Sequence, residues 1–139
     1  MPSYDEVEVG TVLPERTFPI TRADLIRYCG ASGDVNVIHW NERVAKAVGL
    51  PDVIAHGMCT MAVAGRTVTD WAGDPGAMTE YSVRFSRPVV VPDDDRGALL
   101  SVRGTVEDKR EDGTVVVGLV ATVDGSKVLT NARAVVRLR

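Results

Sequence analysis

The segment from Gly57 to about Trp71 most restricts how the chain can fold. It reads Gly-Met-Cys-Thr-Met-Ala-Val-Ala-Gly-Arg-Thr-Val-Thr-Asp-Trp, contains no proline, and carries no charge before Arg66 and Asp70. A helix that is apolar nearly all round is a buried helix, because it has no polar face to turn toward water. The segment therefore predicts a central helix that the rest of the chain covers.

After residue 76 the pattern changes to a period of two residues. Tyr81, Val83 and Phe85 alternate with polar neighbours, as expected for a half-buried strand. Three more strand-like runs follow, at about residues 98–109, 114–123 and 127–138. An Asp-Gly dipeptide, typical of tight hairpins, separates each of these runs from the next. We therefore expect the second half of the chain to be an antiparallel meander.

These elements predict a single α+β domain over residues 1–139, with a curled antiparallel sheet wrapped around the long buried helix, an arrangement called a hot dog. A length of 139 residues with 45% hydrophobic and 25% charged residues suits one globular domain. Such a sheet leaves an outer strand edge unpaired in a monomer. We therefore expect a dimer that forms by edge-to-edge pairing.

Two shorter helices are expected before residue 57. Residues 21–24 are spaced as a capping box with Asp in place of Glu, and Gly30 and Gly33 are expected to end this first helix. Its predicted apolar face consists of Leu25, Ile26, Tyr28 and Cys29. Asn41 is placed to cap a second helix over Glu42 to Val48. The segment between the two helices is therefore a loop.

Charge, hydropathy and cysteine content exclude several classes of protein. Sixteen Lys and Arg against nineteen Asp and Glu give a net charge of −3 without a basic block, which disfavours nucleic-acid binding. No apolar run reaches the roughly 18 residues of a membrane helix, and the acidic N-terminus lacks signal-peptide features, so we expect a cytoplasmic protein. Cys29 and Cys59 lack the spacing of a disulfide framework or a zinc site and are expected to be buried.

One loop carries a possible acid/base pair. Asp34 lies five residues before His39, and on an irregular loop the two side chains can converge on one water or substrate proton. The structural alternative is that Asp34 forms an Asx turn and His39 caps the next helix. The loop also begins like an EF-hand, but Ile38 stands at a ligand position and the glycine is missing, so we exclude calcium and predict no metal.

Gly57 supplies a second chemical feature. A glycine in the first turn of a buried helix lets a ligand approach an unpaired backbone N–H, where the helix dipole favours negative charge. Such a group could form an oxyanion hole for a thioester enolate, although close packing alone also explains a glycine there. The chain has no GxSxG, GxGxxG or P-loop motif, so serine hydrolase, nicotinamide and nucleotide chemistry have no support, and we expect no cofactor.

Several segments together resemble the MaoC-like (R)-specific enoyl-thioester hydratases and dehydratases. They are the opening Val-Gly-Thr-Val-Leu-Pro at residues 9–14, the loop from Tyr28 to His39, Ala55-His-Gly-Met58, Asp74-Pro-Gly76 and the Arg84-Phe85 strand. The likeness extends along nearly the whole chain. It looks greatest for the catalytic B subunits of actinobacterial (3R)-hydroxyacyl-carrier-protein dehydratases.

The resemblance implies reversible hydration of trans-2-enoyl thioesters to (3R)-3-hydroxyacyl thioesters, carried on acyl carrier protein (ACP) or coenzyme A (CoA), without metal or cofactor. It implies that Asp34 and His39 form the catalytic pair. It also implies that Asn36 orders the loop and that the Gly57 amide holds the thioester oxygen; we group Asn36, His56 and Gly57 as substrate-binding residues. Val37 departs from the family pattern, which usually has proline there.

Two rival functions are open to a chain with this fold. A hot-dog thioesterase would use a carboxylate on the central helix, and residues 57–69 contain no Asp or Glu. A non-catalytic partner subunit of a dehydratase would not need to keep a desolvated pair such as Asp34 and His39. The active form is expected to be a homodimer, or a heterodimer with a related hot-dog subunit.

Arg84 and Arg87 are spaced three apart on a predicted strand, so only one of them can line a given surface unless the strand is bulged at Pro88. That surface would suit an acidic carrier protein, and ordinary solvated arginines are the alternative.

Overall fold

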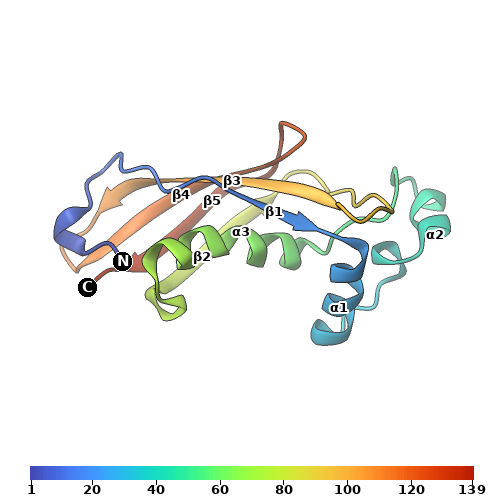
Figure 1. Cartoon of the computed structure of the whole chain (residues 1–139), viewed down its shortest axis with the longest axis horizontal. Helices are drawn as coiled ribbons and strands as arrows, with labels where there is room; N and C mark the ends of the chain where they lie inside the picture. The colour runs from blue at the N-terminus through green and yellow to red at the C-terminus, as the bar shows by residue number, and fades with distance from the viewer.

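In the computed structural model, which describes all residues 1–139, a five-stranded antiparallel sheet curls over the long helix α3 (Gly57–Ala72) (Figure 1). The strands are β1 (Arg16–Ile20), β2 (Met78–Phe85), β3 (Ala98–Lys109), β4 (Thr114–Val123) and β5 (Ser126–Arg137). Two shorter helices, α1 (Arg22–Ser32) and α2 (Glu42–Ala47), lie together beyond one end of the sheet (Figure 1). The predicted α+β hot-dog fold is confirmed.

The strand order, β1-β3-β4-β5-β2, departs from the predicted meander in two places. Strands β3, β4 and β5 are consecutive neighbours, and Val123 pairs with Ser126 across a two-residue hairpin, as the sequence predicts. Strand β2 pairs with β5 and not with β3, because the connection over residues 86–97 carries the chain across to the opposite half of the sheet.

Strand β1, which the sequence patterns did not reveal, pairs with β3 at the other edge of the sheet. It is only five residues long and contains Pro19. Proline cannot donate to a strand ladder, so an edge strand is the position that tolerates it.

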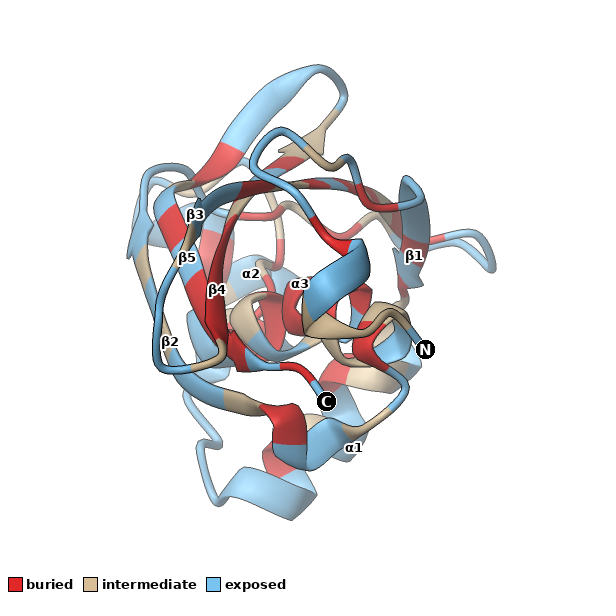
Figure 2. Cartoon of the chain, turned by 90° about the vertical axis from the view of Figure 1, so that its left-hand side faces the viewer, coloured by how far each residue is buried: buried red, intermediate tan, exposed pale blue.

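Helix α3 is buried along one face and not nearly all round. Its buried residues are Cys59, Thr60, Ala64, Gly65, Thr67, Val68 and Ala72. Met58, Ala62, Arg66 and Asp70 form an exposed stripe at four-residue spacing. The end view shows the sheet curving around this helix (Figure 2). The prediction of burial on every face was wrong, because the sheet covers one side of the helix only.

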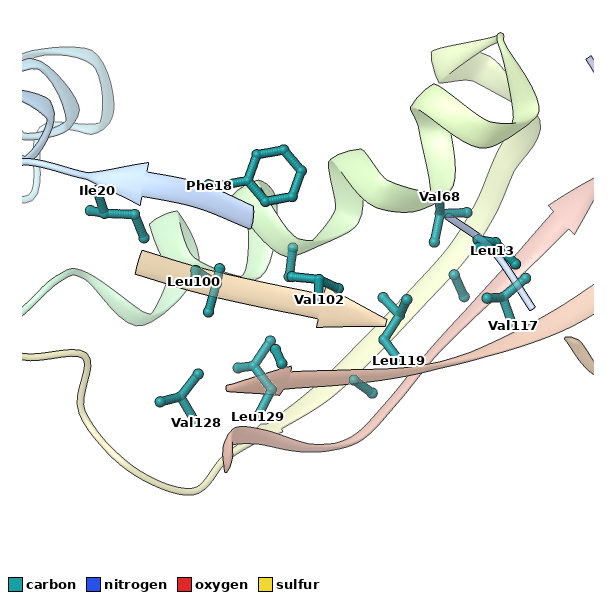
Figure 3. Close-up of a cluster of buried hydrophobic side chains, with 14 of the residues drawn as sticks. Leu13, Phe18, Ile20, Val68, Leu100, Val102, Val117, Leu119, Val128 and Leu129 are labelled. Carbon is teal, nitrogen blue, oxygen red and sulfur yellow. The ribbon is translucent and has the colours of Figure 1, made fainter. Parts of the chain in front are cut away.

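The core lies between the sheet and α3. It is one cluster of 28 buried residues, of which Leu100, Val102, Leu119 and Leu129 come from three neighbouring strands and Val68 from the helix (Figure 3). Burying each such side chain contributes about 1.5–3 kcal/mol relative to leaving it in water. This packing fixes α3 against the sheet and thereby fixes the helix N-terminus in space.

Tyr81 attaches β2 to α3. A Cβ atom on Gly65 would lie 3.0 Å from the Tyr81 ring, so the glycine allows the strand to approach the helix closely. The Tyr81 hydroxyl donates a hydrogen bond to the Met61 carbonyl at 2.9 Å. Burial raises the pKa of Tyr81 to about 12, which keeps the hydroxyl protonated as a donor.

Both short helices that the sequence predicts are present, but the residues at which they end differ from the prediction. Thr21 and Asp24 form the predicted capping box, and Gly33 ends α1 in the left-handed region at φ 77°, where a side chain would be strained. Gly30 lies inside the helix and Ile26 is exposed, in contrast to prediction. None of the helices combines the length and apolar character that a bilayer crossing requires.

Candidate active site

The loop between α1 and α2 is held by a chain of local hydrogen bonds. The Asn36 N–H donates to Asp34 Oδ1 at 3.2 Å, which is the Asx turn of the structural alternative. Asn36 Oδ1 in turn accepts from the Ile38 N–H at 3.3 Å and begins a 3₁₀ turn over Val37–His39. The other half of that alternative is wrong, because Asn41 and not His39 caps α2. Asn36 therefore orders the loop through its backbone contacts.

His39 is buried at 7% exposure, and one ring nitrogen has a fixed partner. Its Nδ1 lies 2.7 Å from the Ile54 carbonyl. A carbonyl oxygen only accepts, so Nδ1 carries the proton of this bond. In the neutral ring Nε2 is then an acceptor, free to take a proton.

The Ile54 carbonyl is itself positioned by the long connection between β2 and β3. The Ala55 N–H donates to the Val89 carbonyl at 2.8 Å, and the Val91 N–H donates to the Val53 carbonyl at 2.9 Å. These two bonds align residues 53–55 with residues 89–91 as a short antiparallel pair. The orientation of His39 thus depends on a segment 50 residues further along the chain.

Asp34 and His39 meet as expected, and a third side chain joins them. A carboxylate oxygen of Asp34 and one ring nitrogen each of His39 and His56 lie within 4.8 Å of one another. Asp34 is exposed and only the two imidazoles are buried. The expectation of a fully desolvated pair therefore holds for His39 and not for Asp34, because Asp34 lies on a loop that nothing in this chain covers.

His56, which the sequence analysis grouped with the substrate-binding residues, does not lie at the cavity. Its side chain is 2% exposed and does not line the neighbouring cavity. The His56 ring stacks on the His39 ring with centroids 3.8 Å apart and planes 23° apart. Its Nε2 lies 3.0 Å from the Asp34 carbonyl oxygen. The His56 side chain therefore contacts the Asp34 loop and not the cavity.

The Asp34, His39 and His56 cluster has the residue types of a metal site, but its geometry does not suit one. Nearly parallel stacked rings direct their in-plane lone pairs side by side and not toward one point. The His56 Nε2 is also engaged by a carbonyl oxygen. The absence of a metal stays a prediction that this arrangement favours.

Gly57 and His39 line the same cavity, which has a volume of about 390 Å³. A Cβ atom on Gly57 would lie 3.2 Å from the Phe85 ring, so the glycine keeps the approach to its N–H open. This N–H is at the first position of α3, where no intrahelical acceptor exists, and it donates no hydrogen bond. It can therefore bind a ligand oxygen, with the helix dipole favouring negative charge.

The remaining walls of the cavity come from segments that the sequence patterns did not connect with the loop. They are Ile54, Ala55, Thr60, Phe85, Ser86, Arg87, Pro88, Val89 and Val128. The run Val89-Val90-Val91 is a strand-like signal that indicates burial, but nothing in the sequence identifies its partner. Arg87 lines the cavity and Arg84 does not. The predicted reason was wrong, because β2 ends at Phe85 and Arg87 lies in the connection that follows the strand.

The family of the chain follows from comparison with known proteins. The MaoC-like domain family matches residues 7–124. The chain belongs to the MaoC-like domain family. The predicted resemblance is thus confirmed, and it covers both the Asp34 loop and the N-terminus of α3.

Relatives of this MaoC-like domain include longer proteins. The 3-hydroxyacyl-thioester dehydratase X of Mycobacterium tuberculosis is 44% identical over 79 residues, which are 57% of this chain and 27% of that protein. A solved structure of a MaoC-like dehydratase superposes with a TM-score of 0.94 at 42% identity, covering 99% of this chain and 42% of that one. The chain therefore spans less than half the length of these two relatives.

A second solved structure has a length similar to that of this MaoC-like domain. The unliganded (R)-hydratase from Pseudomonas aeruginosa has a TM-score of 0.84 and 28% identity, and the alignment covers 98% of this chain and 84% of that chain. The whole domain fold, and not only the matching loop, is therefore shared.

Proposed function

We propose that this MaoC-like domain catalyses the reversible hydration of trans-2-enoyl thioesters to (3R)-3-hydroxyacyl thioesters, as the dehydratase step of fatty-acid elongation. The observation that carries the proposal is that His39 and the Gly57 N–H line one cavity. The relatives named as a hydroxyacyl-thioester dehydratase and an (R)-hydratase support the same reaction.

The two halves of the site act on different atoms of the substrate. The Gly57 N–H donates to the thioester oxygen and stabilises negative charge that develops there as the α-carbon gains or loses its proton. In the hydration direction the water oxygen bonds to C3, and the proton that it releases is balanced by the proton that C2 receives. Asp34 and His39 relay these protons.

The tautomer of His39 gives it a definite part in this exchange. With Nδ1–H donating to the Ile54 carbonyl, Nε2 of the neutral ring accepts a proton from water. The exposed Asp34 carboxylate, which has an oxygen within 4.8 Å of a His39 ring nitrogen, is the second group that can transfer a proton.

The thioesterase alternative has no support from the carboxylates of the helix. Helix α3 ends at Ala72, and its one carboxylate is that of Asp70. Asp70 lies at the far end of α3 from Gly57 and pairs with Arg16 at 3.1 Å. No carboxylate of the helix therefore faces the cavity.

We also propose that the active form is a dimer, with a second copy or a related hot-dog subunit joined along β2. This strand has eight residues and no proline, and its outer edge has no partner. The other free edge, β1, is short and contains Pro19. Met58 and Phe85, the large apolar side chains exposed on α3 and β2, supply surface for such an interface.

The acyl group is proposed to arrive on an acidic carrier protein. Arg87 is exposed at the cavity wall and forms no salt bridge within the chain. An unpaired cation beside the cavity complements an acidic partner. Coenzyme A, which carries phosphates, is the competing carrier.

The decisive experiment measures the hydration of a trans-2-enoyl thioester by the purified chain, alone and with a related hot-dog subunit, and determines the configuration of the product. We expect a (3R)-3-hydroxyacyl thioester. His39→Ala and Asp34→Asn should each lower kcat by at least about 100-fold with folding preserved. Hydrolysis to free thiol, or near-normal turnover by both variants, would count against the proposed reaction.

A further inference from the structure

His56 has a side chain that the proposed chemistry does not use, although it is the second of only two histidines in the chain. It occupies the N-cap position of α3, yet its side chain makes no capping hydrogen bond. The ring instead lies between His39, with centroids 3.8 Å apart, and Tyr28, with centroids 4.6 Å apart. Its only strong polar contact is the 3.0 Å approach of Nε2 to the Asp34 carbonyl.

The surroundings of the two ring nitrogens fix the protonation of His56. Nδ1 is buried and has no hydrogen-bond partner. Nε2 faces a carbonyl oxygen, which can only accept, so the single proton of the neutral ring is on Nε2. Cys29 Sγ, 3.5 Å from Nε2, is close enough for only a weak contact.

The Asp34 carbonyl is where this donor matters most. All other hydrogen bonds of residues 34–36 are made to nearby residues of the chain, namely Ser32 at the end of α1, Ile38, His39, Trp40 and one another. The bond from His56 is therefore the one that ties this exposed stretch to the buried N-terminus of α3. The same helix end carries the Gly57 N–H in the adjacent position.

We infer that His56 is a positioning residue: its Nε2–H anchors the Asp34 backbone and so sets the carboxylate relative to His39 and the Gly57 N–H. Two consecutive residues, His56 and Gly57, then hold the Asp34 loop at a fixed position relative to the N–H that binds the thioester oxygen. The stacking of His56 under His39 fixes the second member of the pair from the same side. This inference rests on the proposed hydratase function, in which Asp34 must reach the reacting atoms.

Steady-state kinetics with a trans-2-enoyl CoA test the positioning role. His56→Ala should lower kcat by about 10- to 100-fold with KM changed less than about threefold, because the binding groups stay while the relay geometry is lost. His56→Gln should recover to within about threefold of wild type, because its amide offers a donor of similar reach. Thr67→Val is the matched control: it removes the other buried unpartnered polar atom, on the same helix, and should leave kcat unchanged.

Nitrogen NMR of the wild-type chain gives a readout that is independent of activity. Two-bond proton–nitrogen correlations should show His56 as the neutral Nε2–H tautomer at pH 7. The Asp34 carbonyl ¹³C shift should move in His56→Ala and return toward wild type in His56→Gln. If the wild type hydrates no enoyl thioester, the proposed function fails, and these signals still decide whether the anchor exists.

Three results would overturn the inference. The first is an Nδ1–H tautomer, which would leave no donor on Nε2. The second is a folded His56→Ala variant with nearly normal kcat. The third is a folded His56→Gln variant as impaired as His56→Ala, because a donor at that position would then not matter. If His56→Ala does not fold, the tautomer and the His56→Gln kinetics decide.

Discussion

At the scale of single residues, the structural and functional interpretations of Asp34 turned out to be compatible. The Asx turn that a purely structural role predicts engages Asp34 Oδ1 with the Asn36 N–H. That same bond restrains the carboxylate whose position the chemistry requires, and it leaves the second oxygen available. A hydrogen bond that orders a loop is therefore also a means of holding a reactive group in place.

Val37 allows a direct test of this ordering. It occupies the first position of the 3₁₀ turn and its N–H donates no hydrogen bond, while Asn36 has φ −53° and ψ 127°, which suits a residue before proline. We expect Val37→Pro to raise the free energy of unfolding by about 0.4–1 kcal/mol in urea titrations. Turnover should be retained; a tenfold loss of kcat would mean that the loop must move during the reaction.

Arg87 and Arg84 differ in position but not in charge, so they form a matched pair for the carrier question. Arg87→Glu should lower kcat/KM for carrier-bound substrate by about tenfold, with a smaller loss on a short CoA thioester, and added salt should reproduce the effect. Arg84→Glu, with the same change of charge outside the cavity lining, should have a smaller effect. Equal losses on both substrates for Arg87→Glu, or none on either, would contradict a docking role for Arg87, and a larger loss on the CoA thioester would instead favour recognition of the CoA phosphates.

At the scale of elements, the N-terminal cap of helix α1 stabilises a helix whose C-terminus leads directly into the Asp34 loop. At its N-terminus Thr21 N–H and Oγ–H both donate to Asp24 Oδ2 at 2.9 Å. The backbone bond from Thr21 is the main cause that holds the pKa of Asp24 below its usual 3.8. The folded state therefore binds a proton at this carboxylate less readily than the unfolded chain does.

The sign of that shift predicts how stability depends on pH. A carboxyl whose pKa is lower in the folded state contributes stability above its unfolded pKa and loses it as pH falls through the folded value. We expect Asp24→Asn to lower the free energy of unfolding by about 1 kcal/mol at pH 7. The difference should shrink at an acidic pH below the usual pKa of 3.8, as the wild-type carboxyl becomes protonated too. Urea unfolding at both pH values checks this, and an unchanged difference would contradict it.

At the scale of the whole molecule, the fold leaves the site open on one side. The sheet wraps α3 but does not cover its exposed stripe, and Asp34 remains in solvent. The end view shows exposed residues along β2, the strand at one edge of the sheet (Figure 2). A partner along that edge would cover the open side of the site. By excluding water, it would strengthen the electrostatic interactions of the groups in the site.

Sedimentation tests this assembly. The wild-type chain should form a homodimer, or a heterodimer once a related subunit is supplied. Met58→Lys should raise the dimer Kd by at least about tenfold, because burying a methionine is worth about 1.5–3 kcal/mol. Val48→Lys, an equally exposed apolar position after α2, should not change the Kd. A monomer that is fully active at nanomolar concentration would refute the dimer.

The sequence alone determined the features that depend on neighbours along the chain. The capping box of α1, the Asp124-Gly125 hairpin, the alternation of the strands and the spacing of Asp34 and His39 all involve residues a few positions apart, whose backbone preferences act before any tertiary contact forms. The central helix was found for the same reason, although how much of it is covered was not.

Tertiary structure decided what depends on pairing between distant segments. The placement of β1 beside β3 and of β2 beside β5, the alignment of residues 53–55 with 89–91, and the cavity between His39, Gly57 and Phe85 join segments whose partners no local pattern specifies. The different position of His56 has the same origin. A histidine before a helix can face a ligand or the interior, and only the burial of its ring under His39, with one nitrogen on the Asp34 carbonyl, selects the interior.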